Sequence, residues 1–500
     1  MSRPSWTSGS ALAALMLFAT PDRVTGQAPR LLPYRDARLT IDARVRDLLK
    51  RMTLEEKFWQ TFMTPGDLEH PGDDYSHGVF GLQISVAPSS APAATSASAA
   101  ARAHAERINR IQRYFVEQTR LGIPIIPFEE ALHGLAREGG TVFPQAIALA
   151  ASWDTALVRR VATSIARETR SRGIRQILSP VVNLASDVRW GRTEETYGED
   201  PLLASRMAVA FVSPFERAGV IATPKHFVAN VGEGGRDSYP IDLNARILEE
   251  YFFPPFKAAL GEGGARSLMT AYNSVDGVPS TQNRWLLHDT LRRQWRFGGF
   301  VISDASATSG ATVLHLTERD TPTAAQHAFE AGLDVVFQTS WEAHRPYLEA
   351  FRRGLIAPSV IDSAVARVLR AKFALGLFEH PYVDGDSAAL WNGHPQHRQL
   401  AREAARATMV LLRNERHILP LDPTQASLAV VGLDANEPRL GGYSAPATTA
   451  SSILDGVRRR VTDGATVRYS AGPGRLGLSY VPVPAEIGRA SCRERVCLAV

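Results

Sequence analysis

The chain has 500 residues, a length that suits two or more domains or one large barrel with an appendage. Hydrophobic residues make up 44% and charged residues 21%, which excludes wholesale disorder. The sequence contains no apolar run of about 18 residues, so it predicts no membrane-spanning helix. The 56 Lys and Arg residues against 51 Asp and Glu residues give a net charge of +5. Because the chain has no basic block interleaved with aromatic residues, this small excess does not indicate nucleic-acid binding.

The N-terminus has the pattern of an export signal. Arg3 supplies a positive start, residues 11–19 form a short apolar core, and the small residues within Thr25–Ala28 suit cleavage. We therefore expect residues 1–28 to be a signal peptide and the protein to be exported, to the periplasm or the cell exterior. The alternative is a short buried helix.

Both cysteines, Cys492 and Cys497, lie near the C-terminus, which excludes a structural disulfide or a cysteine-ligated metal in the rest of the chain. Residues 486–500 show no helical or strand period and resemble a translated sequencing adapter. We expect this segment to be an artefactual tail on a protein that is truncated near residue 485.

Short apolar runs alternate with helix-length stretches through the body of the chain, which is the pattern of parallel β/α units. We expect a (β/α)8 TIM-type barrel over residues 36–384, with Phe58–Met63 a poor candidate for its eighth strand and a doubly wound sheet as the alternative. The other expected strands are Val79–Val86, Ile123–Phe128, Ile174–Val182, Val220–Pro224, Ser267–Ala271, Phe300–Ser303 and Leu333–Phe337. The expected helices cover 105–120, 154–171, 201–218, 244–260, 284–294, 322–331, 342–353 and 359–375.

A composition shift around residues 380–400 predicts a linker over 385–400, followed by an incomplete α/β sandwich domain over 401–485. The expected elements of that domain are strands at Thr408–Leu412, Leu428–Gly432 and Thr466–Tyr469 and a helix at Ile453–Val461.

Polar side chains follow the ends of the expected barrel strands, and in such barrels the chemistry lies at the carboxyl ends, where the loops gather. Acids, cations and aromatic residues at one face suit a neutral, polyhydroxylated substrate, because charged groups bond to hydroxyls and rings stack on a sugar. The candidates are Glu129, Glu130, Asn183, Asp187, Arg192, Lys225, His226, Tyr272, Asn273 and Asp304.

Structural alternatives exist for several of these residues. For Lys225 and His226 the alternative is a satisfied ion-pair network, and for Asp304 it is a cap on the following helix. Glu195 pairs with Arg192 or Lys225 under the same interpretation.

Neither of two further kinds of binding site is predicted. The segment Gly472–Gly477 matches the dinucleotide fingerprint, but a proline occupies its turn and no helix follows, so we reject it. No His-x-x-x-His pair or carboxylate cluster predicts a metal site. We expect neither cofactor nor metal.

Several motifs occur in the order that is typical of glycoside hydrolase family 3, and the chain resembles that family over essentially residues 36–485. The matching stretches are Gly122–Pro124, Glu130–Gly134, Arg189–Pro201, Lys225–Phe227, Glu233–Asp237, Met269–Asn273 and Val301–Asp304.

The resemblance implies a retaining exo-glycosidase that holds a terminal sugar in the barrel mouth. By motif match Asp304 is the nucleophile, and the residues that line the sugar subsite are Glu130, Arg192, Lys225, His226 and Tyr272, with Met269 nearby. An ionised Asp304 beside two cations is expected to keep a low pKa. The sequence departs from the family at Ala305, where a tryptophan often follows the nucleophile.

The leading functional hypothesis is a β-glucosidase acting on β-linked oligosaccharides or glycosides, and the first alternative is a β-xylosidase of the same family. A β-N-acetylhexosaminidase is disfavoured because Val228–Gly232 replaces the Gly-His segment of that type. From other classes, the alternatives are a lyase that uses Lys225 as a Schiff base and a catalytically silent sugar-binding fragment. The oligomeric state is not predicted.

The resemblance also implies a general acid on a glutamate in the second domain. The glutamates after residue 403 and before the suspected tail's Glu494 are Glu415, Glu437 and Glu486, and none stands in the context that the family uses. We therefore expect the nucleophile half of a site without its proton donor.

Overall fold

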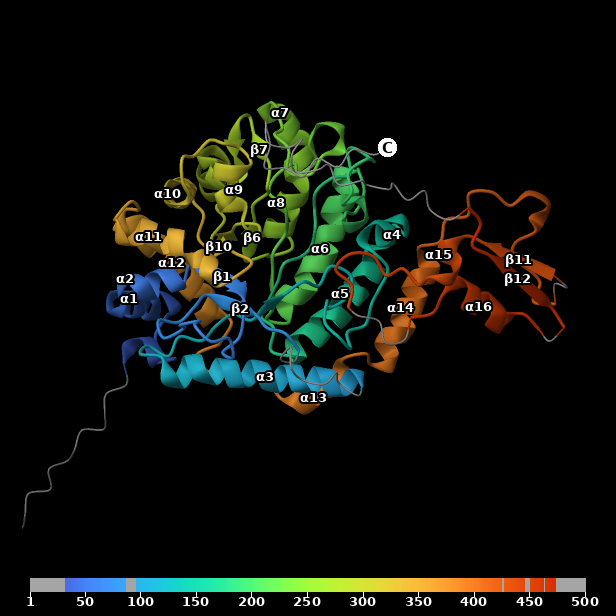
Figure 1. Cartoon of the computed structure of the whole chain (residues 1–500), viewed down its shortest axis with the longest axis horizontal. Coiled ribbons are helices and arrows are strands. Elements are labelled where there is room, and N and C mark those ends of the chain that lie inside the picture. The colour runs from blue at the N-terminus through green and yellow to red at the C-terminus, as the bar shows by residue number, and fades with distance from the viewer. Residues whose placement is uncertain (1–31, 87–95, 425–426, 446–449, 463, 474–500) are drawn as a thin grey trace, which may run out of the picture.

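The computed structural model describes residues 32–86, 96–424, 427–445, 450–462 and 464–473 (Figure 1). The expected signal peptide over 1–28 and the expected tail over 486–500 lie outside the described residues. Among the described residues, no helix is both long and apolar enough to cross a membrane.

Short parallel strands form the centre of the larger part of the molecule. They pair in the orders β10-β1-β2, β3-β4-β5 and β6-β9, and every one of these pairs is parallel. The bounds are β1 (Phe62–Pro65), β2 (Gly81–Gln83), β3 (Phe128–Glu129), β4 (Gln176–Ile177), β5 (Ile221–Ala222), β6 (Ser267–Met269), β9 (Phe300–Ile302) and β10 (Val336–Phe337).

Backbone hydrogen bonds also join these three groups of strands. Ile126 N donates to Phe80 O at 3.0 Å, Phe227 N to Met269 O at 2.8 Å, and Val335 N to Val301 O at 3.1 Å. We call the joined strands the parallel-strand core. The core is an α/β arrangement, because helices connect most of the successive strands.

The strands are short and almost entirely buried, and most of their residues are apolar, as is typical of parallel strands covered by helices. One hydrophobic cluster fills their inner side, with Phe128 and Phe337 in edge-to-face contact at 5.5 Å between ring centres. The weakest expected strand, Phe58–Met63, is confirmed only at its end, because Phe58 and Trp59 belong to α2. The strand β1 (Phe62–Pro65) pairs with β10 on one side and β2 on the other.

The surrounding helices begin at residues that cap them well. Asp154 accepts hydrogen bonds from Ala156 N and Leu157 N at the start of α5, and Asp200 accepts one from Leu203 N before Pro201 opens α6. The helices are α1 (Ile41–Arg51), α2 (Leu54–Trp59), α3 (Ala97–Gln118), α4 (Ala146–Ala151), α5 (Thr155–Ser171), α6 (Pro201–Arg217), α7 (Ala245–Ile247), α8 (Phe253–Gly261), α9 (Ala307–Val313), α10 (Thr321–Ala331), α11 (Arg345–Arg352) and α12 (Pro358–Ala374), with π-helices at Leu248–Phe252 and Trp285–Gln294.

The expected linker over 385–400 folds as helix α13 (Gly385–Trp391) and the start of helix α14 (Pro395–Ala407). Both helices are fixed to the rest of the chain by buried polar contacts. Asn392 Oδ1 accepts from Arg172 Nε at 2.7 Å, and His397 Nδ1 lies 2.7 Å from Glu168 Oε1. This segment therefore packs against α5 and the turn after it.

The C-terminal part of the chain, beyond α14, carries a small parallel sheet (Figure 1). Strands β11 (Ser427–Val431) and β12 (Thr466–Ser470) pair with Ser427 opposite Thr466, and helices α15 (Leu433–Asn436) and α16 (Ile453–Arg460) accompany them. These elements confirm the expected strands and helix at 428–432, 466–469 and 453–461.

The expected strand at Thr408–Leu412 is wrong. The side chains of Met409 and Leu412 are 76% and 92% exposed, and no described strand pairs with this segment. A strand gains its hydrogen bonds from a neighbour, so an apolar run without a partner does not form one.

Candidate active site

The predicted site residues come together at the C-terminal ends of the parallel strands. Glu130 directly follows β3, Lys225 and His226 follow β5, and Tyr272 and Asp304 follow β6 and β9. Lys225 and His226 are each 1% exposed and Asp304 is 7% exposed. Charged groups buried this deeply are costly unless they are paired or used in binding.

An ion pair joins two of these strand ends. Lys225 Nζ lies 2.6 Å from Glu130 Oε1, while Glu130 Oε2 is buried and has no hydrogen-bond partner among the described residues. Burial raises the pKa of Glu130 to about 7. Burial opposes the charge on Lys225, but the Glu130 and Asp304 carboxylates outweigh it and raise the pKa of Lys225. The ammonium is therefore charged at neutral pH and is a poor amine nucleophile, which disfavours the Schiff-base lyase.

Asp304 presents one oxygen to the site. Its Oδ1 accepts from Ala305 N at 2.7 Å, and its Oδ2 lies 3.4 Å from His226 Nε2. The side chain does not cap α9, whose N-cap residue is Ser306. The Tyr272 hydroxyl lies close to the carboxylate, yet Oδ2 has no donor in hydrogen-bonding geometry among the described residues.

The expectation of a low pKa for Asp304 is wrong. Burial raises the pKa of this carboxyl group, although Lys225 and Arg192 act in the opposite direction. The sequence places the cations correctly, but it does not show how completely the strand ends and loops exclude water from the carboxylate.

His226 is held as a neutral imidazole. Its Nδ1 and its backbone N both donate to Asn183 Oδ1, at 2.9 and 2.8 Å, and Asn183 Nδ2 donates to His226 O at 2.9 Å. With the proton on Nδ1, Nε2 is an acceptor, and Arg192 Nη2 donates to it at 3.0 Å. Burial and the neighbouring cations hold the pKa of His226 well below its usual range.

Arg192 is oriented by Glu195, as one of the structural alternatives predicts. Its Nε and Nη2 donate to the two Glu195 oxygens at 2.8 and 2.9 Å, which is a bidentate pair. The pair leaves Nη2 shared with His226, so Arg192 belongs to the site and Glu195 positions it. Asp237, which accepts from Trp190 Nε1 at 2.9 Å, lies 3.9 Å from Arg192 Nη1.

Met269 and Ala305 contact the inner hydrophobic cluster. Met269 is 1% exposed within the inner hydrophobic cluster, and the partly buried Ala305 packs against the same cluster. With alanine in that position, the residue after Asp304 offers no ring to a substrate.

Tyr443, in the C-terminal part of the chain beyond α14, is a site residue that the sequence does not predict. The ring of Tyr443 lies over Lys225, with Nζ 4.9 Å from the ring centre. The segment 440–445 is held there by polar contacts: Gly442 N donates to Glu194 Oε1 at 2.9 Å, and His133 Nε2 lies 3.0 Å from Gly442 O. Gly441 has a φ of +84°, and any side chain there would collide with Gln145. No motif marks Tyr443, because only the tertiary fold brings it to the site.

Two family models match the chain. The model described as the glycosyl hydrolase family 3 N terminal domain matches residues 91–371, and the model for the family 3 C-terminal domain matches residues 409–495. The chain belongs to glycosyl hydrolase family 3. The C-terminal match runs into the segment 486–500.

Curated relatives in family 3 include enzymes of two specificities. A β-xylosidase of Formosa agariphila is 35% identical over 425 residues, which cover 79% of this chain and 59% of the relative. A periplasmic β-glucosidase of Salmonella typhimurium is 31% identical over 481 residues, covering 93% of this chain and 59% of the relative. The chain thus spans about three fifths of the length of these relatives.

Solved β-glucosidase structures resemble the fold closely. A β-glucosidase from Erythrobacter marinus has a TM-score of 0.79 at 32% identity, with 88% of this chain and 60% of the other covered. A β-glucosidase from Listeria innocua, solved with glucose, has a TM-score of 0.74 at 30% identity, with 86% and 60% covered.

The candidate proton donors beyond residue 403 that the structure describes are exposed, whereas the site residues around Asp304 are buried. Glu415 is exposed and pairs with Arg413, and Glu437 is exposed at the end of α15. Glu486 lies outside the described residues.

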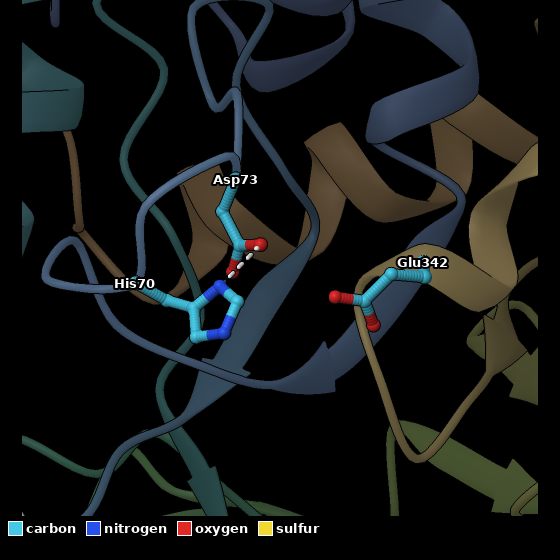
Figure 2. A group of neighbouring side chains, drawn as sticks. All are labelled: His70, Asp73 and Glu342. Carbon is cyan, nitrogen blue, oxygen red and sulfur yellow. Dashed lines mark hydrogen bonds and ion pairs between the residues drawn. The ribbon is translucent and has the colours of Figure 1, made fainter.

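One group of side chains has the composition of a metal site, and it includes none of the site residues around Asp304. His70, Asp73 and Glu342 place one potential ligand atom each within 4.8 Å of one another (Figure 2). His70 and Glu342 are exposed, and Asp73 already contacts His70 Nδ1 at 3.2 Å. Exposed groups of this kind are common without an ion, so we assign no metal to it.

Proposed function

We propose that this protein is a retaining, exo-acting glycosidase that hydrolyses terminal non-reducing β-D-glucosyl residues from β-glucosides or oligosaccharides. The observation that carries the proposal is the buried Asp304 carboxylate, whose Oδ2 is unpaired among the described residues and lies beside His226 and Tyr272. Family membership and the β-glucosidase and β-xylosidase relatives support the same reaction class.

In this reaction Asp304 Oδ2 attacks the anomeric carbon while the bond to the leaving oxygen breaks, and that oxygen takes a proton. Water then attacks the same carbon and gives its proton back to the group that protonated the leaving oxygen, the ester bond to Asp304 breaks, and the sugar leaves with its original configuration. Burial raises the pKa of Asp304, and the nearby cations Lys225 and Arg192 oppose this shift, which favours the ionised carboxylate that a nucleophile needs.

The sugar hydroxyls would be bound by the charged groups around Asp304. Lys225 donates, the free Glu130 Oε2 accepts, and the Arg192–His226 pair offers both functions. Tyr443 would supply the ring that Ala305 lacks, at the side of the site that faces Lys225. In this assignment Met269 acts only by packing beneath the subsite.

We also propose that the parallel-strand core closes as a (β/α)8 barrel. The hydrogen bonds that join β2 to the β3 segment, the β5 segment to β6, and β9 to the β10 segment support this, as does the pairing of β1 with β10. Export is proposed from the N-terminal pattern of residues 1–28 and from the periplasmic relative.

A β-xylosidase is the second candidate, because a β-xylosidase is among the relatives, at 35% identity. The two sugars differ by one hydroxymethyl group, and a difference of this size in a pocket is worth about 1–3 kcal/mol. Initial rates on p-nitrophenyl β-glucoside and β-xyloside, measured side by side, therefore decide between them.

Asp304→Ala is the central test of the proposal. Because Asp304 lies at the strand ends rather than in the inner cluster, the variant should fold and lose about 10²-fold or more in kcat. Asp304→Asn, which keeps the shape of the side chain, is the matched control for stability. If Asp304→Ala keeps more than about a tenth of the activity at matched thermal stability, another group is the nucleophile.

The leaving group tests the proton donor. We consider the case in which none of Glu415, Glu437 and Glu486 protonates the leaving oxygen. Dinitrophenyl β-glucoside should then still glycosylate Asp304, because its leaving group needs little protonation, while cellobiose should not turn over. Turnover of cellobiose by the 500-residue chain at an ordinary rate of about 1–10³ s⁻¹ would place the donor within this chain.

A further inference from the structure

A groove of about 570 Å³ lies far from Asp304, at the opposite end of the parallel strands. It is lined by the C-terminal turns of α5 and α6, which lead into the starts of β4 and β5, and by α13 and the residues before it (Figure 1). Its charged and aromatic lining residues are Arg167, Arg170, Arg217, Tyr382, Asp384 and Trp391.

The arginines of this groove have no carboxylate partners among the described residues. The side chains of Arg170 and Arg217 form neither an ion pair nor a hydrogen bond with any described residue. The Arg167 side chain stacks on Trp391, with its guanidinium carbon 4.2 Å from the ring centre. Other arginines on the same two helices are paired: Arg160 with Glu403 and Arg206 with Glu262.

A further buried guanidinium adds to this positive charge. Arg175 is 2% exposed, and among the described residues its side chain donates to the carbonyl of His380 from Nη2 at 3.3 Å. A Cβ built on Gly219 would lie 3.9 Å from Arg175 Nη1 and 4.0 Å from Arg170 Nε, so both side chains reach the same turn. Burial and the charge of Arg170 lower the pKa of Arg175 to about 9.

The negative groups nearby do not balance these cations. The C-termini of α5 and α6 each attract a cation, typically by about 0.3–1 kcal/mol, which is weaker than a full negative counter-charge. Asp384 is already engaged, because its carboxylate accepts from Asp386 N and Ser387 N at the start of α13. The stacked Arg167 and the buried Arg175 remain without a counter-charge in the described residues.

We infer that this groove binds the phosphate group of a small molecule through Arg167, Arg170 and Arg217. Planar guanidinium groups bind phosphate oxygens in a bidentate manner, and stacking on Trp391 holds the Arg167 guanidinium in place for such a contact. The groove is large enough to accept a phosphorylated sugar as well as inorganic phosphate. This site is separate from the proposed glycosidase site and does not depend on its activity.

The test measures phosphate binding by the 500-residue chain and two matched double variants. Arg170→Gln/Arg217→Gln removes two groove cations, and Arg159→Gln/Arg206→Gln removes two exposed cations from the same two helices. Isothermal titration with inorganic phosphate, glucose 6-phosphate and sodium chloride at matched ionic strength separates specific binding from screening.

We expect phosphate and glucose 6-phosphate to bind the wild-type chain and the Arg159/Arg206 variant equally well. The Arg170/Arg217 variant should bind about tenfold or more weakly, since it loses charge-assisted hydrogen bonds. The ratio of the two affinities shows whether the sugar contributes. Equal binding by all three proteins places the anion elsewhere and overturns the inference, as does the absence of binding to the wild-type chain. Thermal unfolding of each variant confirms that it is folded.

Discussion

The side chain of Asn183 forms three hydrogen bonds with His226. Its oxygen accepts from both Nδ1 and the backbone N of His226, and its nitrogen donates to the His226 carbonyl. This arrangement puts the imidazole proton on Nδ1. It leaves Nε2 as an acceptor 3.0 Å from Arg192 and 3.4 Å from Asp304 Oδ2. Asn183 therefore sets the protonation of a group beside the proposed nucleophile without being placed to touch the substrate itself.

Asn183→Asp should change the charge of His226. A carboxylate next to Nδ1 favours the imidazolium form, so the pKa of His226 should rise from its depressed value. At low pH the charged ring can no longer accept from Arg192, so kcat/KM of the variant relative to wild type should fall by about tenfold or more and recover as pH rises.

The control for this variant is Asn183→Ala, which removes the side-chain hydrogen bonds to His226 without adding a charge. Its activity should fall by a factor that stays constant with pH. If both variants show the same pH profile of kcat/KM, Asn183 has only a structural role.

The pKa of Glu130 predicts a second pH effect. Burial raises it to about 7, so below neutral pH Glu130 is protonated and cannot accept through both oxygens. Activity should rise with pH as Glu130 ionises, and Glu130→Gln should lose about 10²-fold in kcat/KM and lack this rise. Profiles of kcat/KM from pH 5 to 8 check this, and an unchanged acid limb in the variant would assign the limb to Asp304 alone.

The stability of the folded chain should respond to Glu130 in the opposite direction. A carboxyl group whose folded pKa lies above its usual value of about 4.3 stabilises the fold below that value, and the stabilisation is lost as pH rises through the folded pKa. Urea midpoints of wild type should therefore fall relative to Glu130→Gln between about pH 4 and 7.

Much of the candidate site could be predicted because buried parallel strands end in charged residues. An apolar strand followed at once by Glu130, Lys225 or Asp304 is hard to explain unless those groups face a site. The strand ends also identified Asn183 as a candidate, but its role depends on His226 O and N lying in reach, and no sequence pattern shows that.

The features that the sequence does not predict have physical causes. Tyr443 reaches Lys225 only because the segment 440–445 docks on Glu194 and His133, which lie far away in the chain. The direction of the Asp304 pKa depends on how completely water is excluded, and residue types do not report that. The strand expected at Thr408–Leu412 has suitable residues, but a strand needs a neighbour as well as a pattern.

Tyr443→Ala should weaken substrate binding, because the ring that covers Lys225 is lost. A stacking contact of the ring with the sugar is worth about 0.5–1.5 kcal/mol, so KM on p-nitrophenyl β-glucoside should rise by roughly 2- to 10-fold. Tyr443→Phe keeps the ring and should behave like the wild type. If the phenylalanine variant is impaired as strongly as the alanine variant, the hydroxyl and not the ring is the functional group.

Lys372 is a fully buried amine that no proposed reaction uses. Its Nζ donates to Gln60 Oε1 at 2.5 Å and Val79 O at 3.2 Å, and the ring of Phe80 lies 5.9 Å away. Burial holds the pKa of Lys372 well below its ordinary value. Because the unfolded chain binds a proton here below about pH 10.4 and the folded chain binds it only at a much lower pH, folding stability should rise with pH across that window.

Lys372→Met should remove this dependence. The free energy of unfolding of the wild type, minus that of the variant, should rise between pH 6 and 9 by up to about 1.4 kcal/mol per pH unit. The loss of the Gln60 hydrogen bond in the variant is a constant offset, since neither remaining partner titrates. Urea denaturation at three pH values measures the difference, and the exposed Lys50→Met serves as the control that should show no such slope. A wild type that parallels Lys372→Met at every pH would mean that the buried ammonium stays charged in the folded protein, stabilised by Gln60 and Val79 alone.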